Sequence, residues 1–353
     1  MKKSFKCISL MLSSLLILGC GSTAFSAATV EDNESVKAIY EKIEEGRTVL
    51  YDENNNEIPV EKLNDDTENI NKKLPQKYDL RDYGRVSKVK NQGSEGYCWA
   101  FASVASMESS ILSQNDLKSK LGENPQDTID LSEAGQTWYI HSGIVDKSSP
   151  FYGDYINDSS KGSNGGTSDT LAISLNSGFG TYPQSLCPYN EVKKGFSETL
   201  RYYSDYRLKD YSEISNNKDT LKSKIVSNGA VTVYYANITD CYSSDYANYY
   251  SDNTCIGIGD SHLIVVVGWD DNYSKDNFTG KVKPSNDGAW LCKNSWGEHY
   301  GNDGYIWISY DTTNLAFSQY IMQDNNAYDN EYQNCFVTQG YGYNYEGAEN
   351  VFT

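Results

Sequence analysis

The sequence predicts an α+β protein, because segments with helical features come first along the chain and segments with strand features come last. The predicted helices span 98–112, 132–141 and 220–227, and the predicted strands span 231–235, 262–269, 289–293 and 304–310. Gly229 follows the third helix, at a position where glycine commonly ends helices. This order favours a helical lobe facing a sheet lobe over a repeating β-α-β unit.

The length, net charge and hydrophobic content argue against a nucleic-acid-binding protein and against a membrane-spanning protein. The chain has 353 residues, a net charge of −18 and 38% hydrophobic residues. A polyanion repels phosphate groups, so we expect no nucleic-acid partner. After the first 28 residues, no stretch reaches the roughly 18 apolar residues that a transmembrane helix needs. We therefore expect a soluble chain of two lobes or domains.

The first 28 residues have the layout of a secretion signal. Three lysines within the first six residues precede an apolar run, 8–18, and small residues follow up to Ala28. The run 17–20 also resembles a bacterial lipobox, which would make Cys20 a lipid attachment site. Cleavage after Ala28 would instead remove Cys20. Both readings place the mature protein outside the cytosol, either secreted or anchored by lipid.

The next segment, 29–73, has a different composition. Within 31–47, apolar residues recur at helical spacing, which predicts a short helix. These residues are Val36, Ile39, Tyr40 and Ile43. The following stretch, 52–71, is rich in Asp, Asn and Glu and predicts an extended arm. A new unit opens at Leu74-Pro75.

The cysteines and acidic clusters give no sign of a metal site. None of the eight cysteines has CxxC spacing, and no Asp/Asn cluster has EF-hand spacing, so we expect neither metal nor cofactor. Disulfides are permitted in an exported chain, and Cys241 with Cys255 is the pair we favour. Cys292 lies in an apolar run and is expected to be a buried free thiol.

Three positions carry the candidate chemistry. Cys98 follows a Gly-rich loop and begins a helix, where the helix dipole and unpaired N–H groups are expected to lower the thiol pKa. His262 enters an apolar strand, and Asn294 follows another strand. Each residue alone is more often structural. The chain has only three histidines, however, and of these only His262 lies on a predicted strand that could aim it at a thiol.

Taken together, these positions resemble the papain-like cysteine peptidases over about residues 74–310. The stretch 74–92 is similar to the family's mature N-terminus and ends at Gln92, six residues before Cys98. The remaining matching motifs are Leu131-Ser132-Glu133, Asn164-Gly165-Gly166 and Asn294-Ser295-Trp296-Gly297. The run 267–278 and its long spacer are most similar to the clostridial cell-wall cysteine proteases. The resemblance implies a papain-like two-lobed fold, with a helical N-terminal lobe, an antiparallel β-sheet or barrel C-terminal lobe and the active site in the cleft between them.

The resemblance also implies roles for individual residues. Cys98 is the expected nucleophile, His262 its ion-pair partner and the acid for the leaving amine, and Asn294 the residue that orients the imidazole. The Gln92 amide and the Cys98 N–H are expected to form the oxyanion hole. Three further residues would serve the substrate or the triad. Trp296 would shield the His–Asn bond, and Gly165 and Gly166 would pair with an extended peptide.

The expected organisation follows from this resemblance. Residues 1–28 form the signal, 29–73 a short propeptide, 74–322 the peptidase, and 323–353 a tail or the start of a lectin-like domain. The partners are protein or peptide substrates and the chain's own propeptide, with contact to a cell wall or surface protein. Glu95 and Ser163 replace the two cysteines of a common family disulfide, and Tyr97 replaces a small residue, which leaves the local cleft shape open.

Two alternative functions remain at this stage. One is another Cys-His enzyme, such as a transglutaminase-like acyl transferase, although that class favours an Asp where this chain has Asn294. The other is a catalytically silent papain-fold module that binds a wall or carbohydrate, which the acidic, Tyr-rich composition permits. A gelatin assay with and without reductant separates the three classes.

Overall fold

The computed structural model describes most of the chain in two compact units, one that includes 1–73 and one that includes 74–331. In the first unit it describes the backbone of 26–32, 35–44, 47–51 and 57–58. In the second it describes 74–148, 152–153, 160, 162–176, 178–255 and 260–327. Most of the predicted signal, with Cys20, and the tail from 328 onward lie outside the described residues.

The first unit contains a four-stranded antiparallel sheet in the order β1-β2-β3-β4. Its strands are β1 (Ser26–Asp32), β2 (Ser35–Glu44), β3 (Arg47–Tyr51) and β4 (Glu57–Ile58). The prediction of a helix within 31–47 is therefore wrong. Three of its four apolar residues that suggested a helix, Val36, Ile39 and Ile43, are β-branched and also favour a strand. Glu44 pairs with Arg47 across a two-residue connection whose sequence contains Gly46, a typical hairpin signal.

The second unit begins with helices and continues into a large mixed sheet. Its helices are α1 (Cys98–Ser113), α2 (Asn115–Lys118), α3 (Pro125–Thr128), α4 (Glu133–Ile140), α5 (Ser168–Asn176) and α6 (Lys218–Asn228). Its longer strands are β6 (Tyr206–Ile214), β7 (Val231–Asn237), β10 (Asp260–Asp270), β11 (Ala289–Lys293), β12 (Tyr305–Ser309) and β13 (Ala316–Asp324). Its short strands are β5 (Lys77–Asp79), β8 (Tyr242–Ser243) and β9 (Asn248–Tyr249).

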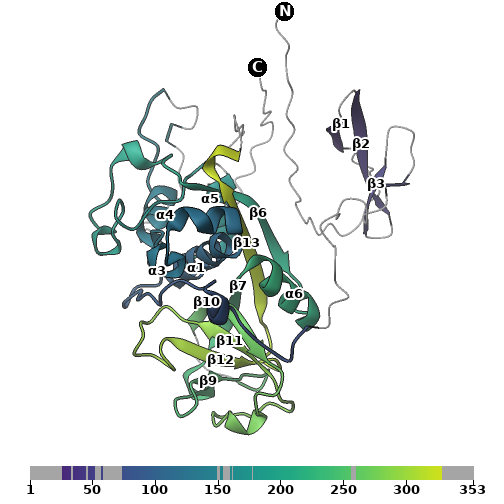
Figure 1. The fold of residues 1–353 in the computed structure, drawn as a ribbon, viewed down its shortest axis with the longest axis vertical. Helices are drawn as coiled ribbons and strands as arrows, with labels where there is room; N and C mark the ends of the chain where they lie inside the picture. Colours follow the sequence, from purple (N-terminus) through teal and green to yellow (C-terminus); the bar gives the residue numbers. More distant parts are fainter. Residues whose placement is uncertain are drawn as a thin grey trace, which may run out of the picture. The chain divides into compact units, whose positions relative to one another are not determined.

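The sheet runs in the order β6-β13-β7-β10-β11-β12-β9-β8, with β5 paired to β10. All of its strand pairs are antiparallel except β9 with β12. Helix α1 packs against β10 and β13, with α4 and α5 beside it (Figure 1). It is buried on nearly all sides, because its Ala, Ser, Met and Leu side chains fit between the sheet and the other helices.

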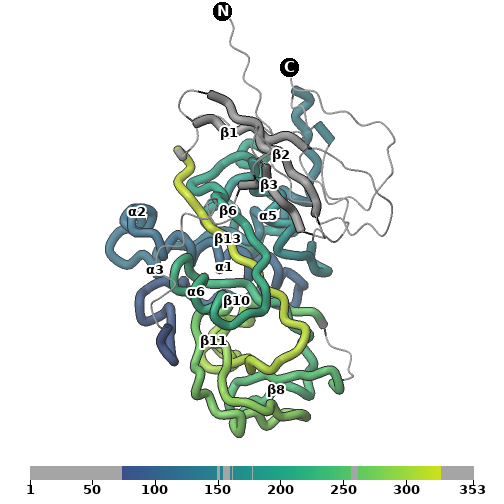
Figure 2. The backbone as a smooth tube through the Cα atoms, turned by 90° about the vertical axis from the view of Figure 1, so that its right-hand side faces the viewer, coloured from purple at the N-terminus to yellow at the C-terminus, as the bar shows by residue number. Residues whose placement is uncertain are grey.

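In the second unit, the helices and strands predicted from the sequence all occur. The structure adds α5, β6 and β13, which the sequence analysis did not predict. Strand β13 crosses position 323, where the predicted tail begins, and lies between β6 and β7. Figure 2 shows β6 and β13 side by side near α5, with β11 and β8 at the other end of this unit. Residues 323 and 324, which belong to the predicted tail, are therefore part of the main sheet.

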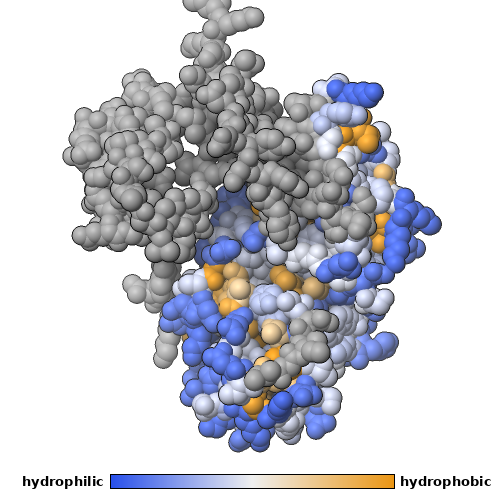
Figure 3. All heavy atoms as spheres, turned by 180° about the vertical axis from the view of Figure 1, so that it is seen from behind, coloured by the Kyte–Doolittle hydropathy of each residue, from blue (hydrophilic) through white to orange (hydrophobic). Residues whose placement is uncertain are grey.

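The cysteines and the surface agree only in part with expectation. Cys292 is a buried free thiol, as predicted. The Sγ atoms of Cys241 and Cys255 lie 2.9 Å apart, but both residues are thiols, so the favoured disulfide is not formed in this structure. The face in Figure 3 is largely hydrophilic with small hydrophobic patches. Within the described residues, no helix is both long and apolar enough to cross a membrane.

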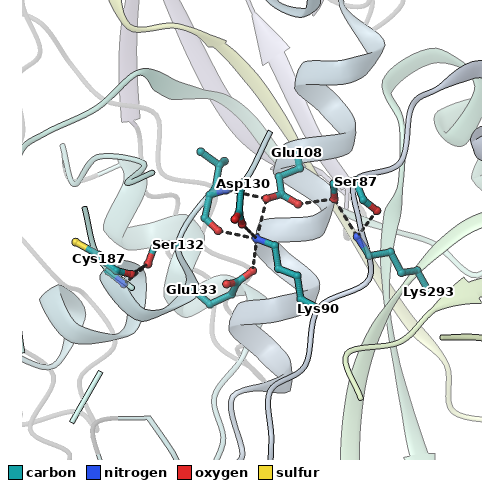
Figure 4. A network of polar contacts seen from close by, with 10 residues as sticks. Ser87, Lys90, Glu108, Asp130, Ser132, Glu133, Cys187 and Lys293 are labelled. Atoms are coloured by element: carbon teal, nitrogen blue, oxygen red, sulfur yellow. Dashed lines mark hydrogen bonds and ion pairs between the residues drawn. The ribbon is translucent and has the colours of Figure 1, made fainter. Parts of the chain in front are cut away.

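A buried charge network joins α1 to the start of the second unit and to β11 (Figure 4). Lys90 Nζ lies 2.9 Å from a carboxylate oxygen of Glu108 and 2.9 Å from one of Glu133. Asp130 supplies a third carboxylate at 2.8 Å. Burial alone would lower the pKa of Lys90, but the three carboxylates together raise it. The lysine therefore stays charged while screened from solvent.

The same network reaches Lys293 through Ser87. Ser87 donates to Glu108 at 2.5 Å, and the Glu108 carboxylate also accepts the Leu131 N–H at 2.8 Å. Lys293 Nζ donates to the Ser87 carbonyl and hydroxyl oxygens, both at 2.9 Å. Burial lowers the pKa of Lys293 to about 8, although nearby carboxylates oppose this shift. The Glu108 carboxylate thus pairs with the Lys90 ammonium group and accepts hydrogen bonds from the Ser87 hydroxyl and the Leu131 N–H.

Replacing Glu108 with Gln should destabilise the fold by about 3–5 kcal/mol, because Lys90 would lose a buried partner. Denaturant titration monitored by tryptophan fluorescence would measure the free energy of unfolding. Exposed Glu123 on the same lobe provides a matched control, and Glu123→Gln should cost no more than about 0.5 kcal/mol. Equal effects of the two substitutions would contradict this role for Glu108.

Candidate active site

The first component of the site is Cys98, the first residue of α1. The loop before it is tied down by the Gly96 N–H, which donates to the Ser163 carbonyl at 2.6 Å. This contact joins the two segments that carry Glu95 and Ser163, the positions where the sequence resemblance led us to expect a disulfide to be missing. Glu95 itself pairs with Lys193 at 2.6 Å. Hydrogen bonds and an ion pair therefore connect this loop to the rest of the lobe.

The second component is the group formed by His262, Asn294 and Trp296. His262 Nε2 lies 2.9 Å from Asn294 Oδ1, and that same oxygen accepts the Ser295 N–H at 2.7 Å. The Trp296 ring stacks on the imidazole, with ring centroids 4.4 Å apart and an interplanar angle of 20°. The imidazole is therefore fixed at one edge and covered on one face.

Burial controls the protonation of both reactive groups. It raises the pKa of the Cys98 thiol, while backbone hydrogen bonding from Leu263 and Trp99 partly opposes the rise. Burial also lowers the pKa of His262 to about 4, against the opposing hydrogen bond to Asn294. The sequence-based expectation of a lowered Cys98 pKa is therefore wrong for this structure, because loss of solvent outweighs the helix terminus.

Gln92 lies beside these groups and is held at both ends of its side chain. Ser295 donates to its Oε1 at 2.6 Å, and its Nε2 donates to the Glu95 carbonyl at 2.8 Å. An amide nitrogen carries two N–H groups, so Nε2 has a second donor beyond the bond to Glu95. Since Ser295 follows Asn294, one turn positions both the histidine partner and the glutamine amide.

A cleft of about 1160 Å³ brings these residues together. Cys98, Gln92, His262 and Trp296 all line it. Asn294 is buried behind His262 and does not line the cleft.

Gly165 and Gly166 line the same cleft. Gly165 has a φ of +119°, which L side chains rarely adopt. A Cβ on Gly166 would lie 2.6 Å from the Trp99 ring, so only glycine fits there. The chain backbone is therefore accessible at these two positions.

The remaining positions of interest lie elsewhere. Tyr97 is buried against Phe101, Ala134 and Val192 and is not among the residues that line the cleft, so the large side chain before Cys98 does not narrow it. His141 is buried at the end of α4, where its Nδ1 lies 2.7 Å from the Thr137 carbonyl oxygen. The sequence analysis did not identify the buried charge network or the acidic lining residues Asp169 and Glu213, because helix packing and strand pairing bring them together from distant segments.

A helix-start cysteine and a strand histidine that is hydrogen-bonded to an asparagine line one cleft, which is an arrangement that suits nucleophilic catalysis by a thiol. A sequence model described as papain family cysteine protease matches residues 74–328. The chain therefore belongs to the papain family of cysteine proteases.

Similar proteins include mammalian and bacterial peptidases. Cathepsin S of Bos taurus is 31% identical over 256 residues, which cover 69% of this chain and 62% of the relative. A clostridial cysteine protease, Cwp84, solved after propeptide cleavage, is 27% identical with a TM-score of 0.60, covering 75% of this chain and 62% of that one.

A second structure contains the cysteine protease and lectin-like domains of Cwp84, a surface-layer-associated protein of Clostridium difficile. It is 28% identical with a TM-score of 0.59, covering 75% of this chain and 56% of that one. The chain thus spans about three fifths of the length of the relatives that it matches.

The lowered pKa of His262 predicts an acid-sensitive fold. The unfolded state binds a proton near pH 6.5 and the folded state only near pH 4, so His262 contributes stability above pH 6.5 that is lost as pH falls toward 4. In a Cys98→Ala background, replacing His262 with Ala should flatten the decline in unfolding free energy over this interval.

The exposed His299 serves as the control for this measurement. Replacing it with Ala in the same background should leave the slope between pH 6.5 and 4 unchanged. Parallel pH profiles for all three proteins would contradict a depressed pKa at His262.

Proposed function

We propose that this chain is a secreted cysteine endopeptidase that is made as a zymogen and acts through Cys98, His262 and Asn294, with Gln92 in the oxyanion hole. One observation carries the proposal. The thiol at the start of α1 and the imidazole bonded to Asn294 line the same cleft, together with an anchored glutamine amide. Acyl transfer by a thiol requires these three functions.

In the proposed reaction, His262 Nδ1 takes the proton of the Cys98 thiol as Sγ bonds to the scissile carbonyl carbon. Burial disfavours a lone thiolate on Cys98 and a lone imidazolium on His262. Transfer of the proton from Cys98 to His262 creates both charges together, and their mutual attraction offsets the cost of burial. The oxyanion would accept hydrogen bonds from Gln92 Nε2 and the Cys98 N–H. His262 then protonates the departing amine, and water hydrolyses the thioester.

Asn294 and Trp296 would act through His262. The bond to Asn294 Oδ1 occupies Nε2 and leaves Nδ1 for proton transfer, while the stacked Trp296 ring keeps solvent from that bond. An extended peptide would lie in the cleft and form backbone hydrogen bonds with Gly165 and Gly166, whose lack of side chains permits close approach. Protein substrates follow from this mode of binding.

Export and zymogen activation are supported by the sequence and by similar proteins. Residues 1–28 have the features of a secretion signal, and 29–73 precede the family-like start at Leu74. Lipid attachment at Cys20 remains the alternative to release. One similar structure is described as a protease after propeptide cleavage, and another as surface-layer associated. We therefore propose that 29–73 is a propeptide and that the mature enzyme works at a cell wall or surface.

Replacing Cys98 with Ala should reduce peptide hydrolysis by at least about 10⁴-fold, because the nucleophile is lost. Asn294→Ala should retain more activity, with a loss of about 10²-fold, since that residue acts by orienting His262. Cys292→Ala, which changes a buried thiol outside the cleft, is the matched control. Turnover of a fluorogenic peptide by a folded Cys98→Ala protein would refute the proposed mechanism.

Self-processing should release the mature enzyme. N-terminal sequencing of active protein should begin within 72–77, and full-length Cys98→Ala should remain unprocessed when incubated alone. Adding a trace of active enzyme should then process the variant. Full activity in a protein that still carries Thr29 would contradict the zymogen proposal, and processing of the isolated variant would contradict self-cleavage.

A further inference from the structure

One wall of the cleft is acidic. Within the described residues, its lining includes the carboxylates of Glu95, Asp169 and Glu213 and no Lys or Arg. Glu95 is paired with Lys193. Asp169 accepts the Tyr211 hydroxyl, and in the described part of the chain neither Asp169 nor Glu213 forms an ion pair. Two negative groups therefore face the cleft without a cation from the described part of the chain.

Strand register places this wall at one end of the cleft. Glu213 on β6 is opposite Ser318 on β13, which is opposite Thr232 on β7. The Thr232 and Ser318 hydroxyls are 2.6 Å apart, so these side chains share a face of the sheet, and all three residues line the cleft. The row continues toward β10, the strand that carries His262.

A buried hydroxyl in the same lining lacks a partner. Ser168, the first residue of α5, is 5% exposed, and its Oγ has no hydrogen-bond partner within the described residues. It directly precedes Asp169 and lines the cleft. A buried hydroxyl left unpaired costs free energy unless a ligand satisfies it. It therefore marks this end of the cleft as a place where a polar group of a ligand could bind.

The dimensions fit a basic side chain of the substrate. Three strand spacings, about 14 Å, separate β10 from β6. The row of Glu213 meets β10 at Val265, three residues or about 10 Å along the strand from His262, so His262 and Glu213 lie about 17 Å apart. Two or three extended residues cover about 7–10 Å, and the four-carbon stem of lysine adds about 6 Å. The departing amine must lie by His262 and Trp296, so the acyl side of the substrate extends toward Asp169 and Glu213. A lysine two or three residues before the scissile bond can reach them.

We propose that Asp169 and Glu213 form a subsite that selects lysine or arginine at the second or third residue before the scissile bond. This inference rests on the proposed peptidase function and adds the substrate class. The chain carries such a sequence itself, Lys72-Lys73-Leu74-Pro75, at its predicted processing site. For cleavage at any bond from 73–74 to 75–76, at least one of these lysines occupies the second or third position.

The test uses quenched fluorogenic peptides that differ only at those two positions, which hold lysine, norleucine or glutamate. Mature enzyme should cleave the lysine peptide with a kcat/KM about tenfold above that of the norleucine peptide, because norleucine keeps the apolar stem without the charge. The glutamate peptide should be the poorest substrate. Added salt should reduce the lysine preference, since the subsite is open to solvent.

Glu213→Gln and Asp169→Asn should each lower the lysine-to-norleucine ratio, and Asp210→Asn should not. Asp210 lies on the same strand, is exposed and does not line the cleft, so it is a matched control. Two results would refute the proposed subsite: equal cleavage of the lysine and norleucine peptides by the mature enzyme, or a lysine-to-norleucine ratio that is unchanged in both the Glu213→Gln and the Asp169→Asn variants. If no peptide in the series is cleaved by folded mature protein, the peptidase function itself fails.

Discussion

The buried ion group around Lys90 is the interaction on which the site geometry depends most. Lys90 holds carboxylates from α1, from α4 and from the segment before α4, and Glu108 extends the group through Ser87 to Lys293. Such groups are costly to bury and are tolerated only when every member is paired. Because Lys293 precedes Asn294, the group that fixes the helices against one another also fixes the strand end that orients His262.

Helices, strands and one turn from different parts of the chain position the reactive residues. Helix α1 presents Cys98, strand β10 presents His262, and the turn after β11 supplies both Asn294 and Ser295, which in turn holds Gln92. Burial makes a lone charge unfavourable on either Cys98 or His262. The low-dielectric site therefore strengthens any interaction formed when charge appears on both.

The sequence predicted those features that depend on local patterns. Cys98, His262 and Asn294 could be identified because each stands at the boundary of a helix or strand with a clear apolar pattern, and the main helices and strands were predicted for the same reason. The 31–47 segment was misassigned because its apolar spacing fits both a helix and a strand. The Lys90 group, α5, β6 and β13, and the acidic end of the cleft depend on register between segments far apart in the chain, which local patterns do not contain.

The position of β13 has a consequence for how the molecule acquires its activity. This strand is the last long element of the described chain, yet it pairs between β6 and β7 and supplies residues 316–318 of the cleft wall. The sheet cannot close until nearly the whole peptidase unit is available, and contacts between distant segments slow folding. If the chain is exported as we propose, its proposed active site would therefore stay incomplete until translocation of this unit is finished.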